Sequence, residues 1–328
     1  QNISPTHSGG LAQARHVFLG GWGLPQAWAG RPQWRILETG FGLGLNFLTA
    51  WQAWRDDPAR PGLLHFVSIE AYPVASADIL RAAAAYPELA PLARQLAEQW
   101  HGLLPGFHRL AFEGGRVLLT LCVGDVRPML RAQRHFEADS IFLDGFSPGR
   151  NPDMWSLDTL KGVTRFARRG TLLATWTVAR ALRDSLGQLG YQARKLPGLP
   201  PKRDCLAALY EPEWNFRRPP APAEQTAGPG HCVVVGAGLA GASVAASLAR
   251  RGWQVTVLDA ASHPAAGASA LPVGLMAPHV SPDDALLSRL TRAGIRATWQ
   301  QVPSLLLEGH HWAATGAMER RPPAPGRL

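Results

Sequence analysis

The chain has 328 residues, roughly twice the length of an average domain, and 46% of its residues are hydrophobic while 17% are charged. This balance is typical of globular proteins and excludes a disordered chain, and no apolar run approaches the roughly 18 residues that a spanning helix needs. Lys and Arg number 33 against 24 Asp and Glu, for a net charge of +9. That charge favours a partner rich in phosphate, although a compositional bias toward arginine explains it equally well.

Cysteine usage and the first residues bear on the compartment. The three cysteines, Cys122, Cys205 and Cys232, are far apart and form no CxxC pair, so the sequence predicts neither a disulfide framework nor a metal site. The opening residues, QNISPTHSGG, have neither the basic nor the apolar segment of a signal peptide. We therefore expect a soluble, cytoplasmic protein without membrane association, and we predict no protein partner.

Predicted strands and helices alternate along the first part of the chain. Strand-like apolar runs cover 33–37, 63–69, 116–123, 138–143 and 170–176, and helical patterns cover 46–55, 75–100 and 179–189. Such alternation predicts a parallel sheet with helices on both faces. The segments YQARKLP and CLAALYE have no helix between them and are expected to form a terminal antiparallel pair.

A proline-rich stretch, EPEWNFRRPPAPAEQTAGPG, then interrupts the pattern. It spans 211–230, contains five prolines and lacks apolar periodicity, as linkers do. Beyond it the alternation restarts with HCVVVGAG, a helix over 239–250 and the strand-like WQVTVLDA. The sequence therefore predicts two α/β domains, over 1–210 and 231–328, joined by a linker.

A glycine-rich turn between a predicted strand and helix is the first candidate site. The turn reads Gly40-Phe41-Gly42-Leu43-Gly44, and glycines let a backbone approach a ligand closely. Its spacing differs from the Gly-x-Gly-x-x-Gly of dinucleotide loops, and Glu38 at the end of the strand would repel a pyrophosphate. A carboxylate there suits a ligand that carries an ammonium and a sulfonium group, which indicates S-adenosylmethionine.

Further acids follow the next predicted strands. Glu70 ends HFVSIE, where a carboxylate can accept hydrogen bonds from both ribose hydroxyls, and Asp125 ends TLCVGD, where the adenine edge is expected. A single acid at a strand end is usually a solvated loop residue. Three in order at the carboxyl ends of successive strands, where open α/β sheets bind ligands, favour a cofactor site.

Asp144 follows the fourth strand-like run, in IFLDGFSPGRNPDMW. It leaves a buried apolar segment and enters a loop stiffened by Pro148 and Pro152. Such a loop can hold an acceptor beside a transferred methyl group. The alternative is that Asp144 caps the following helix, but the glycine and prolines directly after it disfavour a helix there.

Several of these stretches together resemble a known family. ETGFGLGLNFL, LDGFSPGRNPDMW, ARHVFLGG, PELAPLARQLAEQW and PPKRDCL are similar to the methyltransferase domain of the bifunctional tRNA 5-methylaminomethyl-2-thiouridine biosynthesis proteins, over residues 10–213. The resemblance implies methylation of the aminomethyl group on the wobble uridine of certain tRNAs, with Asp144 as the catalytic carboxylate. It also implies that six residues line the S-adenosylmethionine site: Glu38, Gly40, Gly42, Gly44, Glu70 and Asp125.

A second fingerprint follows the linker and has a complete strand–turn–helix context. Gly236 would make the turn, Gly238 would admit a pyrophosphate and Gly241 would pack the helix on the sheet. Asp259, 18 residues after Gly241, would accept the ribose hydroxyls. The fingerprint does not separate flavin from nicotinamide, but the later residues Gly267, Ala268, Ser269 and Gly274 resemble the glycine-oxidase-like flavoprotein domain of the same family. That resemblance implies FAD and oxidative removal of a carboxymethyl group.

The 98 residues from His231 to Leu328 are fewer than a whole flavin oxidase needs. We therefore expect a Rossmann-like S-adenosylmethionine-dependent methyltransferase sheet followed by an incomplete Rossmann-type FAD-binding domain that retains FAD poorly. Two other functions stay open: a flavin oxidoreductase whose first domain only delivers tRNA, and a non-catalytic tRNA-binding remnant. Lys202 and Arg203 are candidate phosphate contacts, with solvated loop charges as the alternative.

Overall fold

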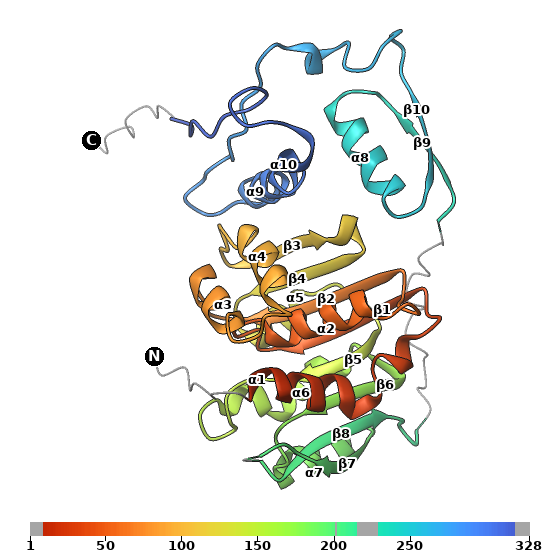
Figure 1. Ribbon diagram of the computed structural model, residues 1–328, viewed down its shortest axis with the longest axis vertical. Coiled ribbons are helices and arrows are strands. Elements are labelled where there is room, and N and C mark those ends of the chain that lie inside the picture. The colour runs from red at the N-terminus through yellow and green to blue at the C-terminus, as the bar shows by residue number, and fades with distance from the viewer. Residues whose placement is uncertain (1–8, 201, 215–228, 319–328) are drawn as a thin grey trace, which may run out of the picture. The chain divides into compact units, whose positions relative to one another are not determined.

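The computed structural model of the chain describes residues 9–200, 202–214 and 229–318 (Figure 1). The chain divides into two compact units, Gln1–Gly228 and Pro229–Leu328. The division falls inside the stretch predicted to be a linker, of which 215–228 lie outside the described residues. The domain boundaries drawn from the sequence therefore stay predictions.

The first unit is built on an eight-stranded sheet in the spatial order β3-β4-β2-β1-β5-β6-β8-β7. Its five central strands are parallel, as predicted: β1 (Gln33–Thr39), β2 (Leu63–Glu70), β4 (Val117–Val123), β5 (Ala138–Leu143) and β6 (Ala167–Thr175). The predicted antiparallel pair is confirmed as β7 (Tyr191–Pro197) and β8 (Asp204–Tyr210), which extends the sheet beyond β6. Strand β3 (Gly106–Phe112), antiparallel to β4, was not predicted, because the exposed first half of this edge strand gives its sequence little apolar character.

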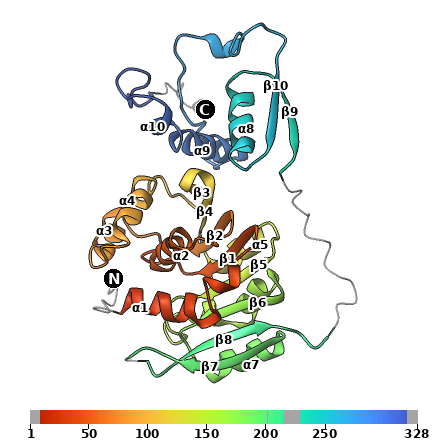
Figure 2. The same cartoon turned by 45° about the vertical axis from the view of Figure 1, so that its right-hand side comes forward.

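Helices cover both faces of the sheet, also as predicted (Figures 1 and 2). One face carries α1 (Gly10–Gln13), the π-helix η1 (Ala14–Leu19), α2 (Leu45–Asp56), α3 (Ser76–Ala83) and α4 (Ala90–Glu98). The other carries α5 (Val126–Ala132), α6 (Leu157–Thr164) and α7 (Arg180–Gln188). Each face therefore has its own apolar core, and β4 between them is buried at every residue.

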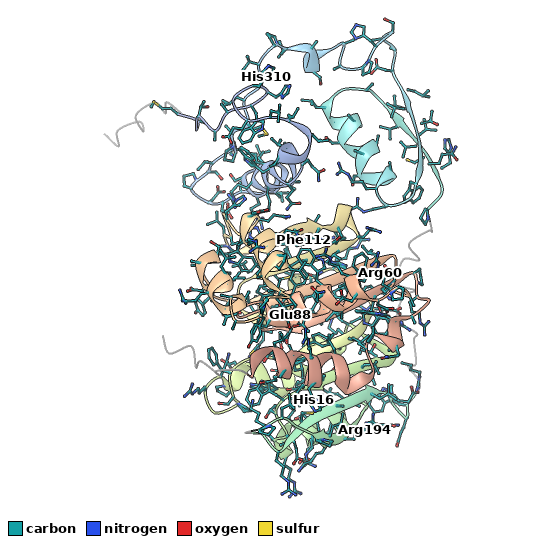
Figure 3. The ribbon with its side chains drawn as sticks, viewed as in Figure 1. His16, Arg60, Glu88, Phe112, Arg194 and His310 are labelled. Atoms are coloured by element: carbon teal, nitrogen blue, oxygen red, sulfur yellow. The ribbon has the colours of Figure 1, made fainter. Side chains whose placement is uncertain are left out.

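Aromatic side chains fill the core under α2. Trp51 and Phe47 of this helix are fully buried, and the ring of Phe112, labelled in Figure 3, lies 4.5 Å from that of Trp51, centroid to centroid. Burial of such large rings contributes a major share of core stability, because the hydrophobic contribution scales with the apolar area removed from water. The core thus fixes α2, and with α2 the glycine-rich turn that precedes it.

The helical pattern predicted over 75–100 is two helices rather than one. Helix α3 ends at Ala83, turns follow over 84–89, and α4 begins at Ala90. Pro87 explains the break, because proline has no backbone N–H to donate and its ring clashes with the preceding helical turn.

The second unit begins with the predicted β–α–β arrangement. Strand β9 (His231–Val235) pairs in parallel with β10 (Gln254–Leu258), and α8 (Leu239–Ala249) connects them. After the short 3-10 helix η6 (Ala268–Ala270), α9 (Leu286–Trp299) and α10 (Val302–Leu305) complete the described part of this unit. Apolar residues of the β–α–β segment remain solvent-accessible, with Val235 84% exposed. Among the helices of the described ranges, none has the length and apolar character to cross a membrane.

Candidate active site

The predicted acids of the first unit gather at one edge of the sheet. Glu38 is the penultimate residue of β1, Glu70 is the last of β2, Asp125 follows β4 and Asp144 directly follows β5. Because these strands are parallel neighbours, their carboxyl ends meet at the same edge. The topology therefore brings together side chains that lie as far apart as residues 38 and 144 in the sequence.

The glycine-rich turn crosses this edge between β1 and α2. Gly40 has a φ of +86°, a conformation that favours glycine, and its amide donates to the carbonyl oxygen of Ile69 at 2.8 Å. A Cβ on Gly40 would lie 2.7 Å from the carbonyl oxygen of Asp144, so the turn packs directly against the start of the Asp144 loop. Gly42 and Gly44 also have positive φ values, of +54° and +75°.

Asn46 joins the buried carboxylate of Glu38 to the half-buried carboxylate of Asp144. Its Nδ2 donates to Glu38 Oε1 and to Asp144 Oδ2, each at 2.9 Å, and Ser68 Oγ donates to Glu38 Oε2 at 2.6 Å. The sequence reasoning did not single out Asn46, although an asparagine among the apolar residues of LNFL is an unusual residue for a buried helix face. Asn46 holds Asp144 in one position relative to the turn.

Glu38 lies beneath the turn rather than at its surface. Its exposed fraction is 0%, and both of its oxygens accept hydrogen bonds from protein groups. In this structure Glu38 contacts only protein groups, and its place in the cofactor site stays a prediction. Its observed contacts position Asn46.

Burial raises the pKa of both carboxyls. Desolvation raises the pKa of Glu38 to about 8, against the lowering effect of its hydrogen bond from Ser68. Burial also raises the pKa of Asp144, while hydrogen bonds from Gly145, Asn46 and Trp176 and the charge of Lys202 act in the opposite direction. A raised pKa makes a carboxylate a stronger base, so Asp144 is suited to accept a proton.

The loop after β5 shapes the surroundings of Asp144. Gly145 N and Trp176 Nε1 donate to Asp144 Oδ1 at 2.8 Å and 3.2 Å. The ring of Trp155, in the short 3-10 helix η5 (Pro152–Trp155), packs edge-on to that of Trp176, with the ring centroids 6.4 Å apart. Trp176, which directly follows β6, was not predicted as a site residue. It forms one wall beside the carboxylate.

Lys202 reaches the same place from the loop between β7 and β8. Its Nζ lies 3.3 Å from the centroid of the Trp176 ring. Burial of the ammonium lowers the pKa of Lys202, and the charge of Asp144 opposes that lowering. The predicted phosphate contact Lys202 thus has its ammonium at the candidate active site, although Lys202 and Arg203 are both exposed as whole residues.

Glu70 and Asp125 lie at the same edge of the sheet, both on the side of this cluster formed by β2 and β4. Glu70 Oε2 accepts from the amide of Gly42 and Oε1 from that of Tyr72, both at 2.9 Å. Glu70 therefore anchors the glycine-rich turn and keeps further lone pairs for a ligand. Asp125 precedes α5, and its side chain makes no capping hydrogen bond to that helix.

The second unit has the geometry of a dinucleotide turn. A Cβ on Gly241 would overlap the carbonyl oxygen of Gly236, which has a φ of +103°, so helix and strand approach as closely as the fingerprint requires. Asp259 accepts from the amides of Ala237 at 2.6 Å and Ala261 at 2.8 Å, and these hydrogen bonds lower its pKa. These residues fit the pyrophosphate and ribose of a dinucleotide.

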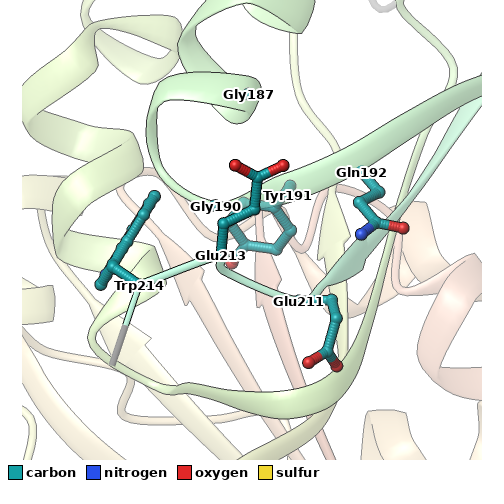
Figure 4. Close-up of a pocket in the computed structure, with 7 residues that line it drawn as sticks. All are labelled: Gly187, Gly190, Tyr191, Gln192, Glu211, Glu213 and Trp214. Atoms are coloured by element: carbon teal, nitrogen blue, oxygen red, sulfur yellow. The ribbon is translucent and has the colours of Figure 1, made fainter. Parts of the chain in front are cut away.

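A hollow at the opposite edge of the sheet is not part of this site. Figure 4 shows it beside the first residues of β7. It is lined by Gly187, Gly190, Tyr191, Gln192, Glu211, Glu213 and Trp214. Because β8 runs antiparallel to β6, residues that follow β8 lie near the amino end of β6, away from Asp144.

Comparison with known proteins defines the class of each part. Residues 87–211 match the family described as S-adenosyl-L-methionine-dependent methyltransferase, and residues 231–319 match the FAD dependent oxidoreductase family. The first range contains Asp125 and Asp144. The chain thus carries a methyltransferase region followed by an FAD-dependent oxidoreductase region, and both cofactors predicted from the sequence are confirmed as those of the matched families.

Comparison with individual proteins narrows the similarity further than the two family matches do. The chain is 63% identical over 311 residues to the tRNA 5-methylaminomethyl-2-thiouridine biosynthesis bifunctional protein MnmC of Polaromonas naphthalenivorans, covering 95% of this chain and 48% of that protein. Identity to the protein of the same name from Polaromonas sp. strain JS666 is 62% over 318 residues, covering 96% and 50%. These similarities confirm the resemblance that the motifs indicated. The chain spans about half the length of the curated relatives it matches.

A solved structure supports the fold. The crystal structure of MNMC2 from Aquifex aeolicus matches with a TM-score of 0.50 and 22% sequence identity, covering 62% of this chain and 63% of that one. At this identity the match shows a shared fold, which agrees with the sheet described above.

Proposed function

We propose that the first unit methylates the primary amine of 5-aminomethyl-2-thiouridine at the wobble position of tRNA, using S-adenosylmethionine, to give 5-methylaminomethyl-2-thiouridine. The observation that carries the proposal is the half-buried Asp144 carboxylate, which Asn46, Gly145 and Trp176 hold beside a glycine-rich turn. The similarity to the two tRNA biosynthesis proteins described above supports tRNA as the substrate class.

The residues at the sheet edge fit S-adenosylmethionine, which when bound supplies an electrophilic methyl group on a sulfonium. A Cβ on Gly42 would meet no protein atom within 4 Å, so a ligand can approach the backbone of the turn there, and Glu70 presents acceptors for ribose hydroxyls. We assign Asp125, after β4, to the adenine edge. These carboxylates also favour a cationic cofactor over a pyrophosphate.

Asp144 prepares the amine for attack. An alkylammonium has no lone pair, so the amine must lose a proton before its nitrogen can form a bond to carbon. Asp144 Oδ2 takes one hydrogen bond, from Asn46, and a carboxylate oxygen can accept two, which leaves a position for the substrate N–H. Asp144 therefore orients the amine and accepts its proton.

Replacement of Asp144 tests the proposal. Asp144→Asn keeps a similar shape but is not a base, so kcat should fall by about 10²- to 10⁴-fold, equivalent to about 3–5 kcal/mol. The affinity for S-adenosylmethionine should stay the same. Asp153→Asn, which neutralises an exposed carboxylate in the same loop, is the matched control. A single-turnover rate for Asp144→Asn within tenfold of the parent chain would contradict the assignment.

For the second unit we propose FAD binding, with Gly238 at the pyrophosphate and Asp259 at the ribose. The close approach of Gly241 to Gly236 and the free lone pairs of Asp259 support it. The corresponding reaction is oxidative removal of the carboxymethyl group from 5-carboxymethylaminomethyl-2-thiouridine, which leaves the amine that the first unit methylates. Loss of FAD fluorescence quenching in Asp259→Ala, with S-adenosylmethionine binding intact, would support this assignment.

A further inference from the structure

The Lys202 ammonium lies over a tryptophan whose edge contacts the candidate catalytic carboxylate. Lys202 Nζ is 3.3 Å from the centroid of the Trp176 ring, well inside the roughly 6 Å within which a cation is attracted to an aromatic face. The Nε1–H of the same indole donates to Asp144 Oδ1 at 3.2 Å. One ring therefore presents its face to a cation and its N–H to the carboxylate.

An aromatic face next to a carboxylate is an arrangement that recognises cations in general. The face attracts the charge through its quadrupole, and the carboxylate adds both charge and a hydrogen-bond acceptor. Asp144 Oδ2 has an acceptor position beyond its bond from Asn46. The charges of Asp144 and Lys202 each favour the ionised form of the other group.

The end of a lysine side chain is chemically the same group as the proposed substrate. Both are a primary ammonium on a methylene carbon. The Trp176 face that attracts one therefore also attracts the other, and two ammonium groups cannot occupy the same position over one ring.

We propose that Trp176 and Asp144 form a binding subsite for a primary alkylammonium, that Lys202 occupies this subsite in the free protein, and that Lys202 must leave before the substrate amine enters. The inference rests on the proposed function for the identity of the amine. It assigns Lys202 a role different from a permanent phosphate contact. Once displaced, the ammonium is available to the phosphates of the tRNA that displaced it.

Occupancy by Lys202 has a measurable cost in affinity. If Lys202 fills the subsite nine-tenths of the time, the apparent affinity for a competing amine is about tenfold below the intrinsic one. Removing the Lys202 side chain should therefore raise the apparent affinity for an amine about tenfold and leave the affinity for a neutral analogue unchanged.

Lysine-specific NMR can observe the displacement directly. The chain has only three lysines, Lys161, Lys195 and Lys202, so labelling with ε-¹³C-lysine gives three methylene signals. The Lys202 signal should be shifted upfield by the indole ring and should lose that shift in Trp176→Leu. On titration with the nucleoside 5-aminomethyluridine it should move toward the position of the other two signals. A Lys202 signal that keeps its upfield shift at saturating nucleoside would overturn the proposal.

Binding of the same nucleoside to variants gives an independent test. Lys202→Met should bind 5-aminomethyluridine about tenfold more tightly than the parent chain and bind 5-hydroxymethyluridine unchanged. Lys195→Met removes an exposed lysine from β7 and is the matched control. Equal or weaker binding of the amine by Lys202→Met would refute the displacement. Because the assay measures nucleoside binding alone, the subsite can be confirmed even if no tRNA methylation is found, and the reverse also holds.

Discussion

Replacing Glu38 by glutamine should make the first unit more stable at alkaline pH. Glu38 is fully buried, and its pKa is raised to about 8 from an ordinary value of 4.5, chiefly by desolvation. A carboxyl with a raised folded pKa keeps its proton longer in the native state than in the unfolded chain. Its contribution to stability is therefore complete below about pH 4.5 and is lost as the pH rises toward 8.

The size of the effect follows from the shift. Between the two pKa values the free energy of unfolding falls by up to about 1.4 kcal/mol per pH unit. Deprotonation of Glu38 should therefore lower the free energy of unfolding of the parent chain by about 4 kcal/mol between pH 5 and pH 8. Glutamine does not titrate and can keep the hydrogen bond from Asn46. The variant should thus match the parent chain near pH 5 and exceed its stability by about 4 kcal/mol at pH 8.

Urea unfolding followed by tryptophan fluorescence measures this difference. Nine of the 12 tryptophans lie in the first unit, so the signal reports mainly on that unit. Glu98→Gln, which neutralises an exposed glutamate on α4, is the control and should leave the pH profile unchanged. Parallel stability curves for Glu38→Gln and the parent chain from pH 5 to pH 8 would refute the reasoning about burial.

Three further predictions concern ligand binding. Glu70→Ala should weaken S-adenosylmethionine by about 1.5–3 kcal/mol, because it removes a charged hydrogen-bond acceptor and frees the Gly42 amide, and an unchanged dissociation constant in calorimetry would contradict this. Gly241→Ala should abolish FAD binding and leave S-adenosylmethionine binding intact, since a Cβ there would overlap the Gly236 carbonyl oxygen, and retained flavin would show that the fingerprint is misinterpreted. The affinity for tRNA should fall by about 0.7–0.9 log units per phosphate contact for each tenfold increase in salt concentration. An affinity that does not change with salt would indicate that the net charge of +9 reflects amino-acid composition and not tRNA binding.

The sequence predicted the sheet and the acids at its edge because both depend on local patterns. Apolar runs mark β1, β2, β4 and β5, and in a parallel sheet each residue after such a run lies at the same edge. Asp144 could therefore be placed next to the glycine-rich turn without knowledge of any long-range contact.

The direction in which each side chain points could not be predicted in the same way. Glu38 is paired in register with Ser68 on β2, so its carboxylate turns into the sheet and accepts a hydrogen bond from the Ser68 hydroxyl. Asn46 contacts a residue 98 positions away, and Trp176 and Lys202 meet through strands that are not adjacent in sequence. Such contacts depend on the register between strands, which the hydrophobic pattern of one segment does not determine.

Mass spectrometry of tRNA nucleosides tests most directly whether Asp144 supports methylation of the aminomethyl group. The chain would be incubated with tRNA that carries 5-aminomethyl-2-thiouridine and with S-adenosylmethionine labelled in its methyl group, and the tRNA then digested. We predict that the label appears in 5-methylaminomethyl-2-thiouridine for the parent chain and that Asp144→Asn forms this nucleoside at least about a hundredfold more slowly. Absence of the labelled nucleoside from a chain that binds both S-adenosylmethionine and tRNA, or its formation by Asp144→Asn at the parental rate, would contradict the proposed function.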